Sequence, residues 1–149
     1  MAKLNIVVGS MLGAAEYVAD HVASLLEQAG HQTRIHNPAR LAEVLGEPEE
    51  ILLVVTSTHG AGDVPDNLQP FARDLAEQRP DLDNLRYGVI ALGDSSYDTF
   101  CQGGKTLDHL LSECGASRIG ERLDIDVTQH EIPEDAAEMW IREWMAMIA

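Results

Sequence analysis

Residues 51–56 read Ile-Leu-Leu-Val-Val-Thr, and this short apolar run decides the fold class. A nearly continuous aliphatic strand is typical of a parallel sheet that helices cover on both faces, because neither face of such a strand meets water. Four other segments have the character of short strands, and they are Leu4–Val8, Thr33–His36, Tyr87–Leu92 and a fifth between Arg118 and Val127. The sequence therefore predicts five strands.

Helical periodicity fills the stretches between these strands. One face of the first predicted helix, which should end at Gly30, carries Val18, Val22, Leu25, Leu26 and Ala29. Another helix should begin near Asn67, whose side chain is expected to cap it, with Pro70 in the first turn. A further helix should close at Gly115, and Pro133 should open the last one. The apolar face of that last helix consists of Ala137, Trp140, Ile141, Trp144, Met145 and Ile148.

Strands that alternate with helices predict an α/β fold, a three-layer sandwich with a parallel sheet in the middle. Right-handed crossovers reduce the topologies to a few, among them half of a dinucleotide-binding Rossmann fold and a five-stranded sheet of order 2-1-3-4-5. In both, ligands bind outside the carboxyl ends of the strands. The 149 residues are close to the usual size of one domain, so we expect residues 1–149 to share one core.

Composition narrows the classes of function. The chain has 25 acidic and 10 basic residues and a formal charge of −15, which disfavours nucleic acid and anionic membranes and favours basic protein surfaces. Simple solubility explains the charge equally well. We expect no signal peptide, no membrane span, a cytoplasmic location and two free thiols, Cys101 and Cys114. The six histidines lack metal-ligand spacing, so no metal site is expected.

The first strand runs into the loop Gly9–Glu16, which leads directly into a helix. The free backbone N–H groups and the positive end of the helix dipole make such a turn an anion site. The Gly-Lys-Ser/Thr ending of a nucleotide-binding P-loop is missing. Taken alone, the small residues of this loop are equally consistent with tight packing.

Two further loops bring planar side chains to the same edge of the predicted sheet. The loop Thr56–Asn67 contains His59 between the strand and two glycines that flank Ala61. The loop Leu92–Cys101 contains Tyr97 among polar residues. Two planar side chains beside an anion site indicate an aromatic ligand that bears a phosphate.

All three loops resemble the FMN-binding loops of flavodoxins and of the FMN domains in diflavin reductases. Residues 10–16 are similar to the family's Ser-x-Thr-Gly-x-x-Glu phosphate loop. Residues 57–67, Ser-Thr-His-Gly-Ala-Gly through Pro-Asp-Asn, and residues 92–101, Leu-Gly-Asp-Ser-Ser-Tyr with Phe-Cys, resemble the other two. The likeness covers essentially the whole chain, and no long insertion interrupts the fifth strand, as in the short-chain group. Flavodoxins are themselves the standard example of the sheet order 2-1-3-4-5.

The resemblance implies an electron carrier rather than a stand-alone enzyme, with FMN as its cofactor and no catalytic residue of its own. Ser10 and the amides of residues 11–15 would hold the phosphate, and His59 and Tyr97 would flank the flavin ring. The Gly60 carbonyl would face N5 of the flavin, and Asp94 would face the pyrimidine edge. The cofactor-binding residues so implied are Ser10, Met11, Leu12, Gly13, Ala14, Ala15, Ser57, Thr58, His59, Gly60, Ala61, Leu92, Gly93, Asp94, Tyr97, Phe100 and Cys101.

The partners implied are basic-surfaced redox proteins, namely a donor like flavodoxin reductase and an unidentified acceptor. They would meet a monomer that presents Asp63, Asp66, Asp94 and Asp98. Negative charge near the ring should lower the potential of the reduced, anionic flavin.

The sequence departs from the family pattern in two places. Leu12, Ala14 and Ala15 replace hydroxyl-bearing residues of the phosphate loop, and each lost bond to a charged group is worth about 1.5–3 kcal/mol. We therefore expect weaker FMN binding than in typical flavodoxins. His59, whose ring can be protonated, stands where the family pattern has a tyrosine, which predicts a potential that depends on pH near the histidine pKa of about 6.5.

Three alternatives follow from the same residues. The altered phosphate loop favours a protein-interaction module with a weak flavin role or none. An FMN enzyme with its own substrate, such as a quinone, would need an acid–base constellation, and the sequence shows none. A phosphorylated receiver domain would need acidic residues where Gly9-Ser10 and Ser57-Thr58 stand, which excludes it.

Overall fold

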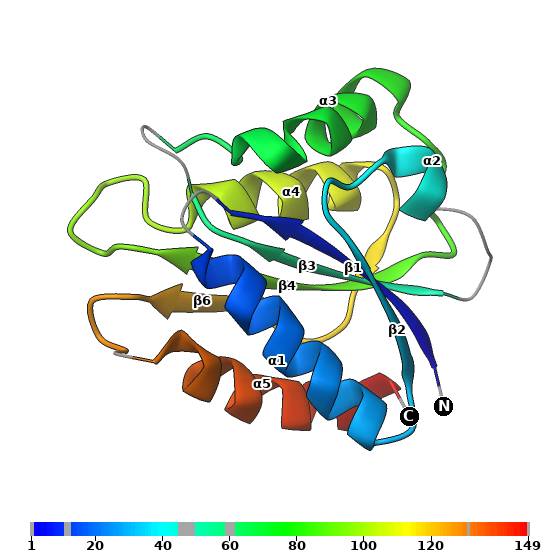
Figure 1. The fold of residues 1–149 in the computed structure, drawn as a ribbon. Coiled ribbons are helices and arrows are strands. Elements are labelled where there is room, and N and C mark those ends of the chain that lie inside the picture. The colour runs from blue at the N-terminus through cyan, green and yellow to red at the C-terminus, as the bar shows by residue number, and fades with distance from the viewer. Residues whose placement is uncertain (1, 11–12, 45–49, 59–61, 131, 149) are drawn as a thin grey trace.

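A computed structural model of the chain describes residues 2–10, 13–44, 50–58, 62–130 and 132–148, and it has the expected alternation of strands and helices (Figure 1). In chain order the elements are β1 (Lys3–Gly9), α1 (Ala14–Gln28), β2 (Gln32–His36), α2 (Leu41–Val44), β3 (Ile51–Thr56), the 3-10 turn η1 (Asp66–Leu68), α3 (Gln69–Gln78), β4 (Arg86–Gly93), α4 (Gln102–Glu113), β5 (Ser117–Arg118), β6 (Leu123–Asp126) and α5 (Pro133–Ile148).

The strands form one parallel sheet of order β2-β1-β3-β4-β5, with β6 also paired to β4, and this confirms the predicted order. Gly9 lies opposite Thr56 in the pairing of β1 with β3, and Thr56 lies opposite Ala91 in the pairing of β3 with β4. β1 and β3 therefore end level with each other and β4 ends two residues further on, and the loops that follow all three leave the same end of the sheet.

The fifth strand differs from its prediction, because it consists of two short pieces. Ser117 lies opposite Arg86, whereas Leu123 lies opposite Ile90, so six residues of this segment advance along only four residues of β4. The extra length is taken up where Gly120 adopts a φ of 68° between β5 and β6. The sheet edge is therefore irregular beside the middle of β4, opposite residues 87–90.

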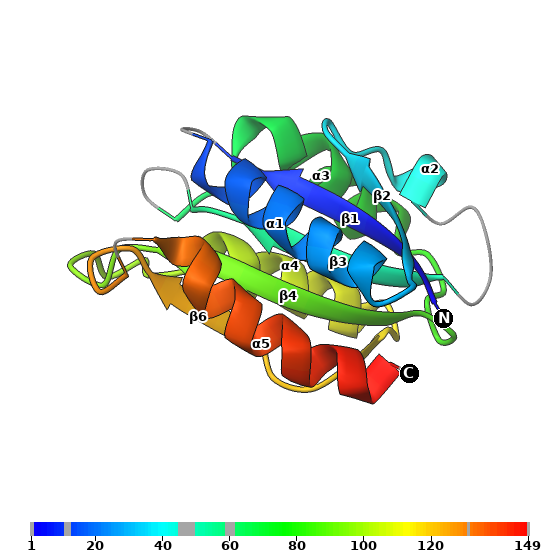
Figure 2. The same cartoon turned by 60° about the horizontal axis from the view of Figure 1, so that its bottom comes forward.

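Helices cover both faces of the sheet. Figure 2 shows α1 and α5 side by side on one face, and α2, α3 and α4 lie on the other. Because successive side chains of a strand point to opposite faces, Leu53 and Val55 pack toward α1 and α5, whereas Leu52 and Val54 pack toward α3 and α4. All four side chains are at most 1% exposed, as the apolar run predicts.

The helix predictions are confirmed except at two ends. Ala29 is exposed, since α1 ends one residue earlier. The helix expected to begin near Asn67 begins at Gln69 after η1, its N-cap residue is Leu68, and no side chain caps it. The prediction that Asn67 caps this helix was therefore wrong, although Pro70 does lie in the first turn of α3. The predicted face of α5 is buried at Ala137, Ile141, Trp144 and Ile148.

Candidate flavin site at the carboxyl ends of three strands

The three loops singled out in the sequence all leave the same end of the sheet, after β1, β3 and β4 (Figure 1). This edge lies where the winding of the sheet reverses between β1 and β3, with α1 on one face and α3 on the other. Open α/β sheets bind ligands at such a point.

The first loop carries the expected anion site. The Ser10 hydroxyl accepts a hydrogen bond from the Gly13 amide at 2.8 Å, and Gly13 has a φ of 88°, which favours glycine. Helix α1 begins at Ala14, so the N–H groups of its first turn point out of the helix at this loop. Met11 and Leu12, also predicted to meet the phosphate, lie outside the described residues.

Asn67 holds the end of β1 instead of capping a helix. Its Oδ1 accepts from the Ser10 amide at 3.0 Å, and its Nδ2 donates to the Val8 carbonyl at 3.1 Å and to Asn37 Oδ1 at 2.9 Å. The Asn37 amide in turn donates to Glu16 Oε1 at 3.3 Å. A capping asparagine and a bridging asparagine look alike in sequence, so no local signal distinguished the two roles.

The second loop is fastened to its neighbours on both sides. The Ser57 amide and hydroxyl both donate to the Gly9 carbonyl, at 2.9 and 3.2 Å. The Thr58 hydroxyl accepts from the Gly103 amide at 3.0 Å, which links the loop to the start of α4. The three following predicted residues, His59, Gly60 and Ala61, lie outside the described part of the chain.

Two carboxylates stabilise the turn of the third loop by accepting hydrogen bonds from its backbone amides. Asp94 accepts from the Ser96 amide at 2.8 Å through its side chain and from the Tyr97 amide at 3.1 Å through its carbonyl. Asp126, at the end of β6, accepts from the Ser95 amide at 3.3 Å and from the Thr128 amide at 3.0 Å. The side-chain hydroxyls of Ser95 and Thr128, and to a smaller extent these two amides, lower the pKa of Asp126 to about 2. Asp126 was not predicted, because nothing in its own segment indicates which loop it meets.

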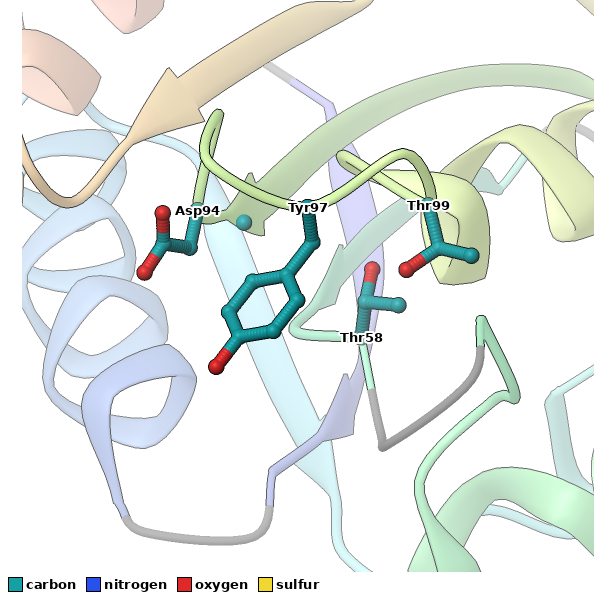
Figure 3. A pocket seen from close by; sticks show the side chains of 5 residues that line it. Thr58, Asp94, Tyr97 and Thr99 are labelled. Carbon is teal, nitrogen blue, oxygen red and sulfur yellow. The ribbon is translucent and has the colours of Figure 1, made fainter.

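A cavity of about 250 Å³ opens between the second and third loops (Figure 3). Its lining residues are Thr58, Gly93, Asp94, Tyr97 and Thr99. Four of these five were predicted to bind the cofactor, and Thr99 was not. Tyr97 is 64% exposed, and its ring projects from the loop between Asp94 and Thr58 (Figure 3). An aromatic ring so exposed offers a face on which a flat ligand can stack.

Three other predicted residues have no exposed side chain, since Ala15, Leu92 and Cys101 are at most 1% exposed. The Cys101 thiol points to the Ala91 carbonyl at 3.5 Å, and burial raises its pKa to about 12, so it is a protonated core group. Phe100 is half-buried beneath Lys105, whose Nζ lies 5.9 Å from the ring centre. The part that each residue plays in cofactor binding stays a prediction.

Comparison with known proteins identifies the class. The family model for flavodoxin matches residues 6–140. Protein MioC of Escherichia coli (strain K12) is 48% identical over 149 residues, covering 99% of each chain, and flavodoxin YqcA of the same strain is 40% identical over 149 residues, covering all of each. The structure of the C101A mutant of flavodoxin from Pseudomonas aeruginosa has a TM-score of 0.90 at 41% identity and covers 98% of each chain.

The chain therefore belongs to the flavodoxin family, as the three loops indicated, and its cofactor is FMN. The run Ser-Thr-His-Gly-Ala-Gly-Asp at residues 57–63 indicates a likeness of the chain to MioC-type proteins, and the full-length match to MioC confirms that likeness for the chain as a whole.

The described residues fit FMN. The cavity offers a flat aromatic face beside hydrogen-bonding groups, and the start of α1 offers donors for a phosphate. Glu16 lies in that first helical turn, but its carboxylate bonds to Asn37. Among the described residues, no helix is long and apolar enough to cross a membrane, and no group of three His, Cys, Asp or Glu side chains is arranged for a metal ion.

Proposed function

We propose that this chain is a carrier that moves electrons between a donor like flavodoxin reductase and a second redox protein. The observation that carries the proposal is the exposed Tyr97 ring beside an open cavity, next to a turn of free amide donors. A flavin seated there would keep an edge within reach of another protein. When bound, FMN supplies the electron-transfer chemistry, and the protein orients it and sets its potential.

The residues of the chain divide this task. The Ser10 hydroxyl and the amides at the start of α1 would hold the phosphate, and Tyr97 would stack on the ring. Asp94 keeps the third loop in its turn, and the carboxylates of Asp94 and Asp126 place negative charge at this end of the site. Such charge disfavours the reduced, anionic flavin and so lowers its potential.

Several features support transient partners with basic surfaces. The formal charge is −15, and Asp63, Asp66 and Asp98 are exposed around the site. Complementary charge accelerates the encounter of two proteins and is screened by salt. A monomer that docks briefly in the cytoplasm fits this reading. Raising the salt concentration should slow electron transfer from a basic reductase, and rates that do not change with salt would remove these contacts from the proposal.

A carrier needs no acid–base machinery of its own. Among the described residues that line the cavity, the titratable ones are Asp94 and Tyr97, and Asp94 already accepts hydrogen bonds from Ser96. A flavin enzyme would instead turn over a small acceptor such as a quinone with a nicotinamide donor alone. The absence of such turnover in the purified protein, together with rapid reduction by an added reductase, is the expected result.

The first experiment adds FMN to the purified protein, removes the excess, and titrates the retained flavin potentiometrically. Retained flavin with two separable one-electron steps supports the carrier. A folded protein that retains no flavin would favour the protein-interaction module, which the alanines at positions 14 and 15 of the phosphate loop already suggest as the second candidate.

A further inference from the structure

We infer that Asn67 is a positioning residue that makes the site selective for a phosphorylated flavin, by holding the end of β1 where Ser10 meets the phosphate. The inference rests on the proposed seating of FMN at this turn. A side chain of the second loop thereby positions a residue of the first loop.

The carboxamide of Asn67 takes the place of a missing strand. The described pairing of β1 with β2 ends at Val7 and His36, while β1 continues to Gly9. In a parallel sheet, a neighbouring strand would donate to the carbonyl of one residue of β1 and accept from the amide two residues later. Asn67 does the same with the Val8 carbonyl, at 3.1 Å, and the Ser10 amide, at 3.0 Å.

The bonds fix the orientation of this amide group. A backbone N–H of Ser10 can only donate and the carbonyl of Val8 can only accept, so Oδ1 must face Ser10 and Nδ2 must face Val8. The second hydrogen of Nδ2 is used by Asn37, whose own amide is thereby turned toward Glu16. An aspartate at position 67 would keep one of these three bonds and lose both donors.

The consequence falls on the phosphate end of the site. Ser10 is held at its amide by Asn67 and at its hydroxyl oxygen by the Gly13 amide, so the hydroxyl proton remains available to a ligand. A serine held in place before binding loses less conformational freedom when the phosphate arrives. Asn67 carries no charge, so it does so without repelling the phosphate.

The test compares FMN with riboflavin, which has the same ring and no phosphate, in binding titrations by fluorescence quenching. Wild-type protein should prefer FMN. Asn67→Leu, close in size and without hydrogen bonds, should weaken FMN binding about tenfold and leave riboflavin binding within about twofold. Asn67→Asp should weaken FMN binding further because of its charge.

Gln69→Leu is the matched control, because Gln69 also donates a side-chain hydrogen bond to backbone, at Val64, but does not reach β1. It should keep the preference for FMN. An equal loss of FMN and riboflavin binding in Asn67→Leu would show a general structural role and overturn the inference, as would an unchanged preference. Wild-type protein that binds both flavins equally would reject the phosphate seat and the inference with it, whereas wild-type protein that binds neither would reject the proposed function as well.

Discussion

The phosphate end and the ring end of the site are both held by hydrogen bonds with side chains, but these side chains differ in charge. The first loop is held by the neutral amide of Asn67, and the third loop is held by the carboxylates of Asp94 and Asp126. Near a phosphate an anion would repel the ligand, whereas near the ring it adjusts a potential. The difference matches the parts of the flavin that each loop would meet.

The two ends of the site also differ in the strands to which their loops are attached. The first loop follows β1, which pairs with β2 as far as Val7 and with β3 as far as Gly9. The third loop is tied to β6 at the irregular edge, where the Val127 amide donates to the Gly93 carbonyl at 2.9 Å. That edge is fastened by Asp108 of α4, which accepts from Tyr87, Arg118 and Arg122 at 2.6–2.8 Å. The ring end therefore depends on a cluster of charges in which Asp108 is buried, Arg122 is half-buried and Arg118 is exposed.

Removing Asp108 should have the largest effect. Asp108 is 7% exposed, and Asp108→Ala would remove the carboxylate to which two arginines and the buried Tyr87 hydroxyl donate, leaving Tyr87 only the backbone carbonyl of residue 108, now at 3.2 Å. We expect the free energy of unfolding to fall by about 3 kcal/mol, measured by urea denaturation. Asp124→Ala is the control, since Asp124 bonds to Arg122 at the surface and should cost under about 1 kcal/mol. Equal losses would show that the edge is not held by this cluster.

The second-largest effect is expected when one methyl group is added at each end of the site, by Gly93→Ala and Gly9→Ala. A Cβ on Gly93 would lie 2.6 Å from the backbone nitrogen of Cys101, whereas one on Gly9 would lie 2.4 Å from Thr56 Oγ1 and 2.9 Å from Leu68 Cδ2. Side chains can shift more easily than backbone. Both alanine variants should lose about 1–3 kcal/mol of unfolding free energy, Gly93→Ala the more. A larger loss for Gly9→Ala would reverse the comparison.

Tyr97 should affect binding without affecting stability. Because its ring is 64% exposed, Tyr97→Ala should change the free energy of unfolding by less than about 0.5 kcal/mol. Loss of stacking should weaken the binding of FMN and of riboflavin alike, by about tenfold. Tyr97→Phe keeps the ring and should bind as the wild type does. A loss confined to FMN would place Tyr97 at the phosphate end instead.

The smallest effect is a titration at the ring end. The pKa of Asp126 is lowered to about 2. The contribution of its ionised carboxylate to the free energy of unfolding is therefore complete above the ordinary carboxyl range and is lost as the pH falls through about 2. The amide signals of Ser95 and Thr128 in nuclear magnetic resonance spectra should shift with that midpoint. Asp126→Asn should abolish the transition, and a wild-type midpoint near 4 would contradict the hydrogen bonds.

What the sequence determined by itself follows from local patterns. Apolar runs such as Ile51–Thr56 specify buried strands, their alternation with helices specifies a parallel sheet, and three loop motifs specify the flavodoxin family. Each of these signals lies within a few consecutive residues. The same holds for Tyr97, whose place after β4 put it at the edge where ligands bind.

Only the tertiary structure decided which side chains hold the loops. Asn67, Asp108 and Asp126 act on segments 10 to 59 residues away along the chain. Nothing in their own neighbourhoods distinguishes a bridge from a cap or a solvated charge, because the partner groups come together only when the strands pair. The division of the fifth strand has the same cause, since its two pieces are set by pairing with β4 and by the arginines that turn toward Asp108.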